Sequence, residues 1–297
     1  MLRIKVLLGP MRIPFLILAP ACVVLGYGTA FWERGRVNPM YFALTLLGAI
    51  AAHISVNALN EYFDFKSSLD FHTDKTPFSG GSGTLPSAPE AARYALVTGL
   101  GSLGITVLVG IYFLIIRGPA LLPIGFLGVV VILASTVWLT RQPLLCLIAP
   151  GLGFGLLMVM GTHFVLTGEY SMPAFVASLV PFFLVSDLLL LNQFPDIEAD
   201  RQAGRRHFPI LLGRRSSAFI YGAFLFFAFS SIGIGVILGF LPGTVLLGLL
   251  PVVIAVPTFI GVLRYGEDMS KLIGNMGLNV LLTVLTPVLV AIGLLIA

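Results

Sequence analysis

The chain has 297 residues, of which 58% are hydrophobic and only 10% are charged, and its mean hydropathy is +1.03. Soluble domains average about 45–50% apolar residues, so this composition excludes an ordinary soluble domain and predicts an all-α, multi-span membrane protein. The net charge of +4 is not the basic footprint of a nucleic-acid-binding protein, because the cations follow the membrane topology described below.

Apolar stretches of about 20 residues can cross a bilayer as helices, and the chain contains nine of them. We expect them to form a single transmembrane domain over 1–297, packed around a central cavity. A secretory signal is the alternative interpretation of the first stretch, but a cleaved signal has a shorter apolar region of about 7–15 residues. The predicted spans lie at about 11–31, 39–61, 93–116, 120–139, 143–167, 173–194, 216–239, 242–263 and 275–297.

The positive residues predict the orientation of the bundle. If the N-terminus lies inside, 14 of the 17 Lys and Arg residues fall on the inner side and only Arg34, Arg36 and Arg117 on the outer side. Cytoplasmic loops carry such an excess of Lys and Arg. We therefore expect a multi-pass protein of the cell's inner or plasma membrane, surrounded by lipid, with a cytoplasmic N-terminus.

An acidic segment ends the second span and reads Asn60-Glu-Tyr-Phe-Asp64, followed by Asp70. Polar residues on a membrane helix face the bundle interior rather than lipid. Interhelical hydrogen bonding is an alternative explanation for His53 and Asn57, but it does not account for the carboxylates that follow them. The stripe runs at i, i+4, i+7 or i+8, and i+11 along one helix face: His53, Asn57, Asn60 or Glu61, and Asp64.

A second acidic segment ends the sixth span, 132 positions later, and reads Asn192-Gln-Phe-Pro-Asp196, followed by Asp200. It repeats the spacing Asn-x-x-x-Asp of the first segment. The shared spacing is compatible with an internal duplication in which spans one to four match spans five to eight. In the predicted topology both segments face the cytoplasm, so two similar half-sites can close around one ligand.

Clustered carboxylates beside apolar spans are costly unless they bind cations. Oxygen ligands select a hard ion, and Mg²⁺ prefers a few carboxylates together with phosphate oxygens of a substrate. No His and Cys cluster in the sequence competes for zinc. Cations that could bind phosphate stand beside both segments, although membrane topology alone is the alternative explanation for them: Lys66, Lys75, Arg201, Arg205 and Arg206.

The paired segments resemble the UbiA superfamily of intramembrane prenyltransferases over the whole chain. The resemblance rests on Asn60…Asp64…Asp70 and on Asp196-Ile-Glu-Ala-Asp200-Arg201-Gln-Ala-Gly-Arg205-Arg206. The Asp-Phe-Lys continuation of the first segment and the glycine-rich stretch 76–83 are similar to the branch that prenylates dihydroxynaphthoate on the way to menaquinone. Glu61 stands where the family commonly has Asp, and Ser68 takes the usual third acidic position, which Asp70 would have to cover.

The resemblance implies Mg²⁺-dependent transfer of a polyprenyl group from a polyprenyl diphosphate to an aromatic quinone precursor. The implied metal ligands are Asn60, Asp64, Asp70, Asp196 and Asp200. The implied catalytic residues are Asp64, Asp196 and Arg201. The implied substrate-binding residues are Asn57, Tyr62, Lys66, Lys75, Asn192, Arg205 and Arg206.

Two alternatives stay open. The same fold and metal site could serve another acceptor, such as a glycerol-phosphate lipid, haem or a chlorophyll-type alcohol, or an intramolecular cyclisation. A cation-coupled transporter could instead bind ions through its acidic residues. Clustering of the acids at one membrane face disfavours the transporter.

Overall fold

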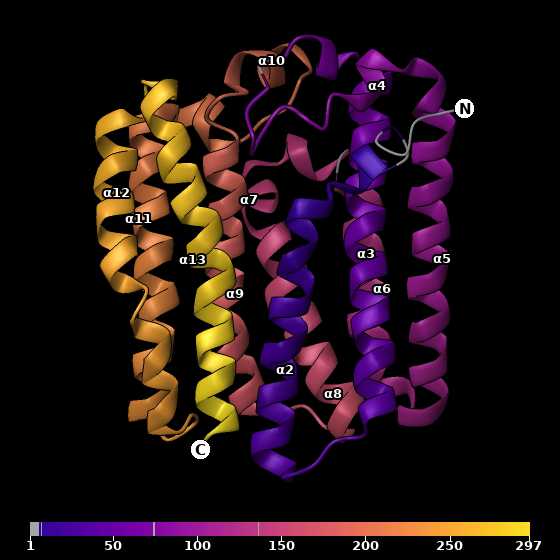
Figure 1. The fold of residues 1–297 in the computed structure, drawn as a ribbon, viewed down its shortest axis with the longest axis vertical. Helices are drawn as coiled ribbons and strands as arrows, with labels where there is room; N and C mark the ends of the chain where they lie inside the picture. Colours follow the sequence, from indigo (N-terminus) through magenta and orange to yellow (C-terminus); the bar gives the residue numbers. More distant parts are fainter. Residues whose placement is uncertain (1–5, 7, 74, 136) are drawn as a thin grey trace.

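The computed structural model describes residues 6, 8–73, 75–135 and 137–297, and the regular elements among them are all helical. The helices run side by side in one bundle (Figure 1), which confirms the predicted fold class. The long ones are α2 (Leu18–Arg34), α3 (Pro39–Lys66), α5 (Ala92–Arg117), α9 (Met172–Asn192), α11 (Phe208–Ile237), α12 (Val252–Tyr265) and α13 (Met269–Leu295).

Eight helical segments of the described chain are long and apolar enough to cross a membrane, where nine were predicted. The predicted fourth span, 120–139, forms a shorter apolar helix, Pro119–Ala134, which comprises η5 (Pro119–Leu121) and α6 (Leu122–Ala134). The Ser135 hydroxyl at its end donates to the Ile132 carbonyl at 2.9 Å and to Asn60 Oδ1 at 3.0 Å. These bonds hold the chain beside the first acidic segment, where the helix ends.

The predicted fifth span follows one path but is not a uniform α-helix. It consists of α7 (Pro143–Gly151), a π-helical stretch η7 (Leu152–Val159) and α8 (Met160–Thr167). Pro150 has no backbone N–H to donate within the helix, and a π-helical turn follows it. A Cβ added to Gly151 or Gly155 would lie 2.0 or 2.5 Å from backbone atoms of Phe182. The two glycines therefore let this segment pack closely against α9.

A cap at the start of α3 and a hydrogen bond to α5 position this helix. Asn38 caps the helix, since its Oδ1 accepts the Met40 N–H at 2.9 Å. On the face opposite the stripe, the Ser55 hydroxyl donates to the Gly99 carbonyl of α5 at 2.8 Å. The helix continues to Lys66, five residues beyond the predicted limit of 61, so Asp64 lies on its last turn.

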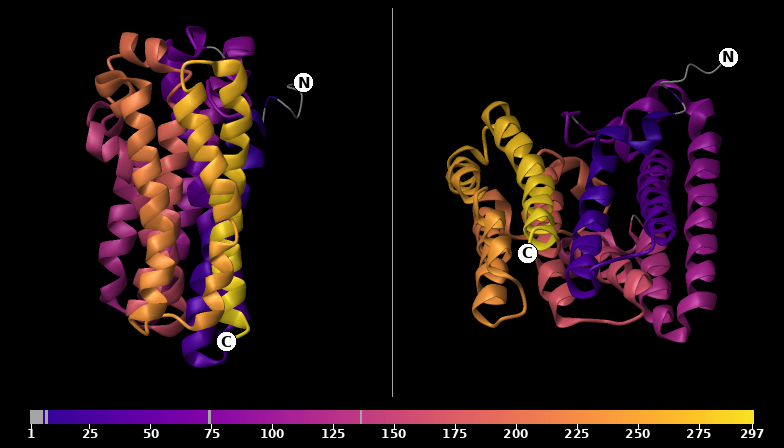
Figure 2. Two further views of the ribbon diagram at one scale, coloured as in Figure 1. Left: turned by 90° about the vertical axis from the view of Figure 1, so that its left-hand side faces the viewer. Right: turned by 60° about the horizontal axis from the view of Figure 1, so that its bottom comes forward.

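The two acidic segments meet at one end of the bundle. The elements that follow them, α4 (Thr84–Ser87) and α10 (Ile197–Gln202), lie together at that end, and the C-terminus lies at the opposite end (Figure 1). Helices α11, α12 and α13 form one side of the bundle, and α3 and α5 lie on the other (Figure 2). The largest buried cluster joins α2, α9, α11 and α13, with Leu25, Leu184, Tyr221 and Met276 fully enclosed.

Candidate functional site

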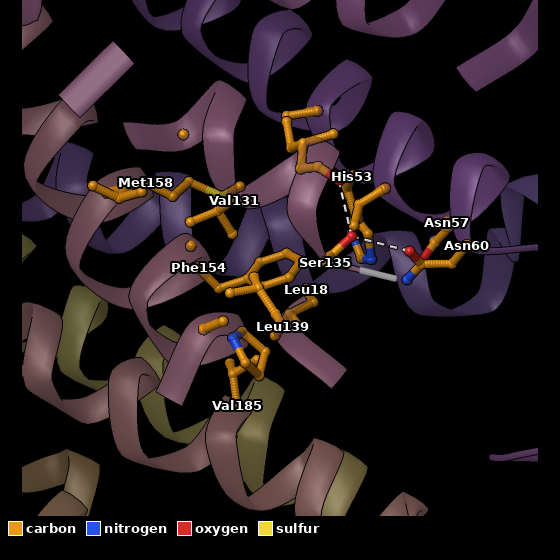
Figure 3. A pocket seen from close by; sticks show the side chains of 18 of the residues that line it. Leu18, His53, Asn57, Asn60, Val131, Ser135, Leu139, Phe154, Met158 and Val185 are labelled. Carbon is orange, nitrogen blue, oxygen red and sulfur yellow. Dashed lines mark hydrogen bonds between the residues drawn. The ribbon is translucent and has the colours of Figure 1, made fainter. Parts of the chain in front are cut away.

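A cavity of about 810 Å³ extends from the end that carries the acidic segments into the bundle. This volume lies within the range of about 300–1,000 Å³ that is typical of small-molecule sites. In Figure 3, His53, Asn57 and Asn60 of α3 lie on one side, and the apolar Phe154 and Met158 lie across from them. The cavity thus has a polar mouth and an apolar interior.

The apolar interior reaches the outer surface of the bundle. Ile111 of α5 and Phe126 of α6 both line the cavity, yet they are 47% and 71% exposed. Since the outer surface of a membrane bundle faces lipid, a long apolar chain could extend from the cavity into the bilayer between these helices.

The first acidic segment contributes three carboxylates to the mouth. Asp64 comes from the last turn of α3, and Asp70 from the short turn η3 (Leu69–Phe71). Glu61 is buried and accepts the Ser82 N–H at 3.0 Å together with a hydrogen bond from the Ser82 hydroxyl. Glu61, which replaces the family's common Asp, therefore holds the glycine-rich loop rather than pointing freely into the cavity.

The second acidic segment, unlike the first, does not lie on one continuous helix. Helix α9 ends at Asn192, a turn containing Pro195 follows, and α10 begins only at Ile197. Asn192, Asp196 and Asp200 nevertheless all line the cavity. The turn therefore brings the three side chains to one site without a shared helix face.

Arg205 joins the two acidic segments. Its Nη1 lies 2.9 Å from Asp200 Oδ1, and its Nη2 donates to Asp64 Oδ1. The second Asp200 oxygen lies 2.9 Å from His207 Nε2. One guanidinium thus bridges carboxylates that are 136 positions apart in the sequence.

The glycine-rich loop also reaches across the mouth to both segments. The Gly80 N–H donates to Asp196 Oδ2 at 3.2 Å, while Ser82 binds Glu61 as described above. Gly81 adopts a left-handed φ of 69°, and a Cβ there would lie 2.9 Å from Asp70 Oδ1. A glycine is required at this position because a side chain would face both backbone strain and a clash with the carboxylate.

The crowded carboxylates have altered proton affinities. Burial, together with the nearby Glu61 and Asp64, raises the pKa of Asp70 to about 7. Burial and the Asp200 charge likewise raise the pKa of Asp196 to about 7, although the Gly80 hydrogen bond opposes the shift. Burial opposes the charged form of Arg205, but Asp64 and Asp200 outweigh it and raise the pKa of the guanidinium. Such shifts are expected where like charges share a desolvated site.

Eight of the predicted site residues line the cavity: Asn57, Asn60, Asp64, Asp70, Asn192, Asp196, Asp200 and Arg205. Asn57 is engaged by the N-terminal segment, since its Nδ2 donates to the Met11 carbonyl at 3.0 Å. Asn60 Oδ1 accepts the Ser135 hydroxyl described above.

Five other predicted residues, all within the described chain, do not line the cavity in this structure: Tyr62, Lys66, Lys75, Arg201 and Arg206. Lys66 Nζ lies 5.8 Å from the centre of the Tyr62 ring. Arg201 is exposed and pairs with Glu198 at 3.0 Å. Lys75 and Arg206 are also exposed. Their assignment to substrate remains a prediction that would require movement of the loops.

Arg12 and His207 line the cavity and contact other residues of its mouth, but they were not predicted as site residues. Arg12, between η1 (Gly9–Met11) and η2 (Ile13–Ile17), lines the mouth, stacks 4.9 Å from the centre of the Phe15 ring and donates to the Phe78 carbonyl at 3.4 Å. His207 lines it as well and binds Asp200. Arg12 was read only as a topology signal, although it is a single cation at the start of a span.

The oxygen atoms of the mouth fit a hard cation. Within the described residues, no group of three or more His, Cys, Asp or Glu side chains is already arranged around a metal position. Three buried carboxylate or amide oxygens of the mouth nevertheless have no hydrogen-bond partner in the described structure: Asp70 Oδ2, Asn192 Oδ1 and Asp196 Oδ1. Carboxylate and amide oxygens are the donors that Mg²⁺ uses. These residues therefore suit Mg²⁺ better than zinc.

The fold and the site define a class of protein: a multi-span membrane bundle with an acidic and cationic mouth above an apolar cavity. A family comparison makes this assignment specific. The chain belongs to the UbiA prenyltransferase family, whose model matches residues 18–281.

One curated relative is the 1,4-dihydroxy-2-naphthoate octaprenyltransferase of Bacillus subtilis (strain 168). It is 27% identical over 194 residues, which cover 63% of this chain and 60% of the relative. The match thus spans less than two thirds of that relative's length.

Solved structures share the fold. A UbiA homologue from Aeropyrum pernix K1 is 17% identical with a TM-score of 0.66, covering 95% of this chain and 97% of the homologue. A UbiA homologue from Archaeoglobus fulgidus bound to GPP and Mg²⁺ is 14% identical with a TM-score of 0.61, covering 98% and 100%. A structure described for digeranylgeranylglyceryl phosphate synthase is 15% identical with a TM-score of 0.65 and covers all of both chains.

Proposed function

We propose that this chain transfers a polyprenyl group from a polyprenyl diphosphate to an aromatic acceptor, a precursor of a membrane quinone. The division of the cavity is the observation that carries the proposal. Its mouth gathers carboxylates and arginines, and its interior is apolar and reaches the lipid-facing surface. A prenyl diphosphate has the same division between an anionic head and an apolar chain.

Mg²⁺ is the cofactor that the mouth fits, with Asn60, Asp64, Asp70, Asp196 and Asp200 as the residues that would hold it. When bound, such an ion stabilises the negative charge that develops on a leaving diphosphate. The solved Archaeoglobus fulgidus homologue, which shares the fold, is described as bound to GPP and Mg²⁺. This supports the choice of ion.

The chain's cations would bind the diphosphate oxygens. Arg12 and Arg205 already line the mouth, and arginine matches phosphate geometry with two parallel hydrogen bonds. Arg201 of α10, and Arg206 and Lys75 of the neighbouring loops, have exposed side chains. In this proposal they approach the diphosphate when the loops close over it.

His53 is our candidate for the group that activates the acceptor. It lines the cavity below the mouth, is 5% exposed, and its ring packs edge-on against Phe154 with centroids 4.7 Å apart. Its Nδ1 has no hydrogen-bond partner in the described structure. A neutral imidazole in this position can accept a proton from a hydroxyl group.

The proposed reaction has three steps: activation of the acceptor, transfer of the prenyl group and restoration of the aromatic ring. The acceptor's ring hydroxyl gives its proton to His53 Nδ1, and its electron pair enters the ring. The ring carbon then bonds to C1 of the prenyl group, and the electron pair of the C1–O bond leaves with the diphosphate. Loss of CO₂, or of a ring proton to the released diphosphate, then shifts an electron pair through the ring to its oxygen. The oxygen takes its proton back from His53, and the aromatic ring is restored. The apolar walls keep water from the reactive allylic carbon.

The aromatic acceptor is supported by the Bacillus subtilis relative, which is named as a 1,4-dihydroxy-2-naphthoate octaprenyltransferase. We infer a cytoplasmic mouth from the distribution of Lys and Arg, 14 of 17 on that side. Substrates would then reach the site from the cytoplasm and from the membrane.

The experiment is a transfer assay with purified full-length protein, Mg²⁺ and a radiolabelled prenyl diphosphate. The acceptor panel contains dihydroxynaphthoate, 4-hydroxybenzoate and a glycerol-phosphate lipid. We expect a prenylated product with an aromatic acceptor only. Product with the lipid alone would replace the aromatic acceptor with a non-aromatic one. Absence of both product and released diphosphate with every acceptor would refute the enzyme proposal.

A further inference from the structure

The guanidinium of Arg205 occupies the position between the two acidic segments. It contacts one oxygen of Asp64, from α3, and lies 2.9 Å from one oxygen of Asp200, from α10. These two carboxylates belong to the proposed metal site, and they come from different halves of the chain. Arg205 thus occupies oxygens of two of the carboxylates that would hold a metal ion in the proposed function.

The surroundings of Arg205 allow its side chain to move while its backbone stays fixed. The backbone N–H of Arg205 donates to the Asp200 backbone carbonyl at 2.9 Å. The Asp200 carboxylate also contacts His207. The Arg205 side chain itself is 19% exposed and lines the cavity. A swing of the guanidinium toward the cavity therefore does not require the loop to unfold.

The charges of the mouth show why the arginine rests on the carboxylates. Five carboxylates line the cavity: Glu61, Asp64, Asp70, Asp196 and Asp200. Arg12, the other arginine in that lining, contacts a phenyl ring and a carbonyl rather than a carboxylate. Arg205 is thus the arginine of the described lining that neutralises acid directly.

A metal ion that bound these oxygens beside the guanidinium would be repelled by its positive charge. A cation that approaches Asp64 and Asp200 meets the positive charge of Arg205 at contact distance, where repulsion in a partly desolvated site is strong. Arg205 can leave once another anion accepts it, and a diphosphate offers oxygens that match the guanidinium fork.

We propose that Arg205 neutralises Asp64 and Asp200 before the substrate binds, and that it gives way to Mg²⁺ and transfers to the diphosphate when the substrate binds. The metal and the prenyl diphosphate then bind cooperatively, and the metal alone binds weakly. This inference rests on the proposed function, because it requires a diphosphate substrate. Cooperativity of this kind is reciprocal, so the metal also strengthens diphosphate binding by the same factor.

The test measures Mn²⁺ binding to the purified full-length protein by electron paramagnetic resonance, with Mn²⁺ as the spectroscopic probe for Mg²⁺. Each protein is titrated alone and with an unreactive prenyl thiodiphosphate. For the wild type we expect the analogue to tighten Mn²⁺ binding at least 30-fold. For Arg205→Gln we expect Mn²⁺ alone to bind at least tenfold tighter than to the wild type, and the analogue to add less than threefold.

Arg12→Gln is the matched control, since it removes a cavity arginine that touches no carboxylate. We expect it to change the affinity for Mn²⁺ alone less than threefold. Arg205→Lys keeps the charge but loses the two-pronged contact, and we expect it to bind Mn²⁺ alone more tightly than the wild type. It also carries the test if Arg205→Gln fails to fold.

Two results would overturn the inference while leaving the proposed function intact. In the first, the wild type binds Mn²⁺ together with the analogue, but the Arg205 variants bind Mn²⁺ alone no more tightly than the wild type does. The other is an equal effect of Arg12→Gln, which would show that the general positive field suffices. If the wild type binds no analogue at any Mn²⁺ concentration, the proposed function fails, and this inference fails with it.

Discussion

Asp196 has one carboxylate oxygen bound and one available, so its removal separates folding from catalysis. Oδ2 accepts the Gly80 N–H at 3.2 Å, and Oδ1 has no partner in the described structure. A typical hydrogen bond contributes about 0.5–1.5 kcal/mol, and the burial and the Asp200 charge that raise the pKa of Asp196 offset part of that contribution. Asp196 would act through the ion that it holds, which stabilises the leaving diphosphate. Loss of one element of such charge stabilisation lowers kcat on the order of 10²–10³-fold. We expect Asp196→Ala to fold, to lose modest thermal stability and to turn over at this reduced rate.

Glu198→Ala is the matched control for Asp196→Ala. Glu198 lies two residues further along, is 73% exposed and pairs only with Arg201 among the contacts of the described chain. It removes the same charge from the same short segment without touching the cavity. The assay is prenyl transfer with Mg²⁺, alongside thermal unfolding of each variant. Activity of Asp196→Ala within threefold of the wild type, or an equal loss in Glu198→Ala, would refute the reasoning.

Three further predictions concern the loop, the proton affinities and the acceptor side of the cavity. Gly81→Ala should lower turnover more than tenfold, because it adds both backbone strain and a clash near Asp70. Gly35→Ala, at a similar φ of 68° but in open space, should change turnover less than twofold, and equal effects would contradict the clash. The metal-free protein should lose stability as the pH rises from about 4 to about 7, since folded Asp70 and Asp196 hold protons that the unfolded chain releases near pH 4. Thermal unfolding at pH 5 and pH 8 measures this, and a higher midpoint at pH 8 would be the wrong sign. His53→Phe should slow transfer about 10²–10⁴-fold but leave Mg²⁺-dependent binding of an unreactive prenyl diphosphate unchanged, and lost binding would indicate a structural role.

The sequence was most informative where helical periodicity is uninterrupted. The stripe from His53 to Asp64 occupies one face of α3, and its members all line the cavity. Burial of polar groups away from lipid determines that face, so the pattern predicts the orientation without knowledge of neighbouring helices.

The sequence was less informative where tertiary contacts overrule local pattern. The fourth apolar stretch is continuous in composition, yet its helix ends where Ser135 binds Asn60. The π-helical stretch that follows Pro150 packs closely against Phe182 of another helix. Neither contact has a signal in the local sequence.

In the site, too, the sequence predicted some features and missed others that depend on tertiary contacts. Composition and spacing identified the acidic segments, because carboxylates are rare in such a chain. They did not show which cations meet them: Arg205 bridges both segments, whereas Arg201, four residues earlier, points away and pairs with Glu198. Arg12 reaches the mouth through the packing of the N-terminal segment. Such choices depend on the turn after α9 and on the N-terminal packing, which residue spacing alone does not determine.

The central claim is that the two acidic segments form one diphosphate site. The most direct test compares Mg²⁺-dependent binding of an unreactive prenyl diphosphate to the wild type, Asp64→Ala, Asp196→Ala and the double variant. Residues that act on one ligand as a unit give losses that do not add. We predict that each single variant loses nearly as much affinity as the double variant. Losses that add in full, or a single variant that binds like the wild type, would contradict a shared site.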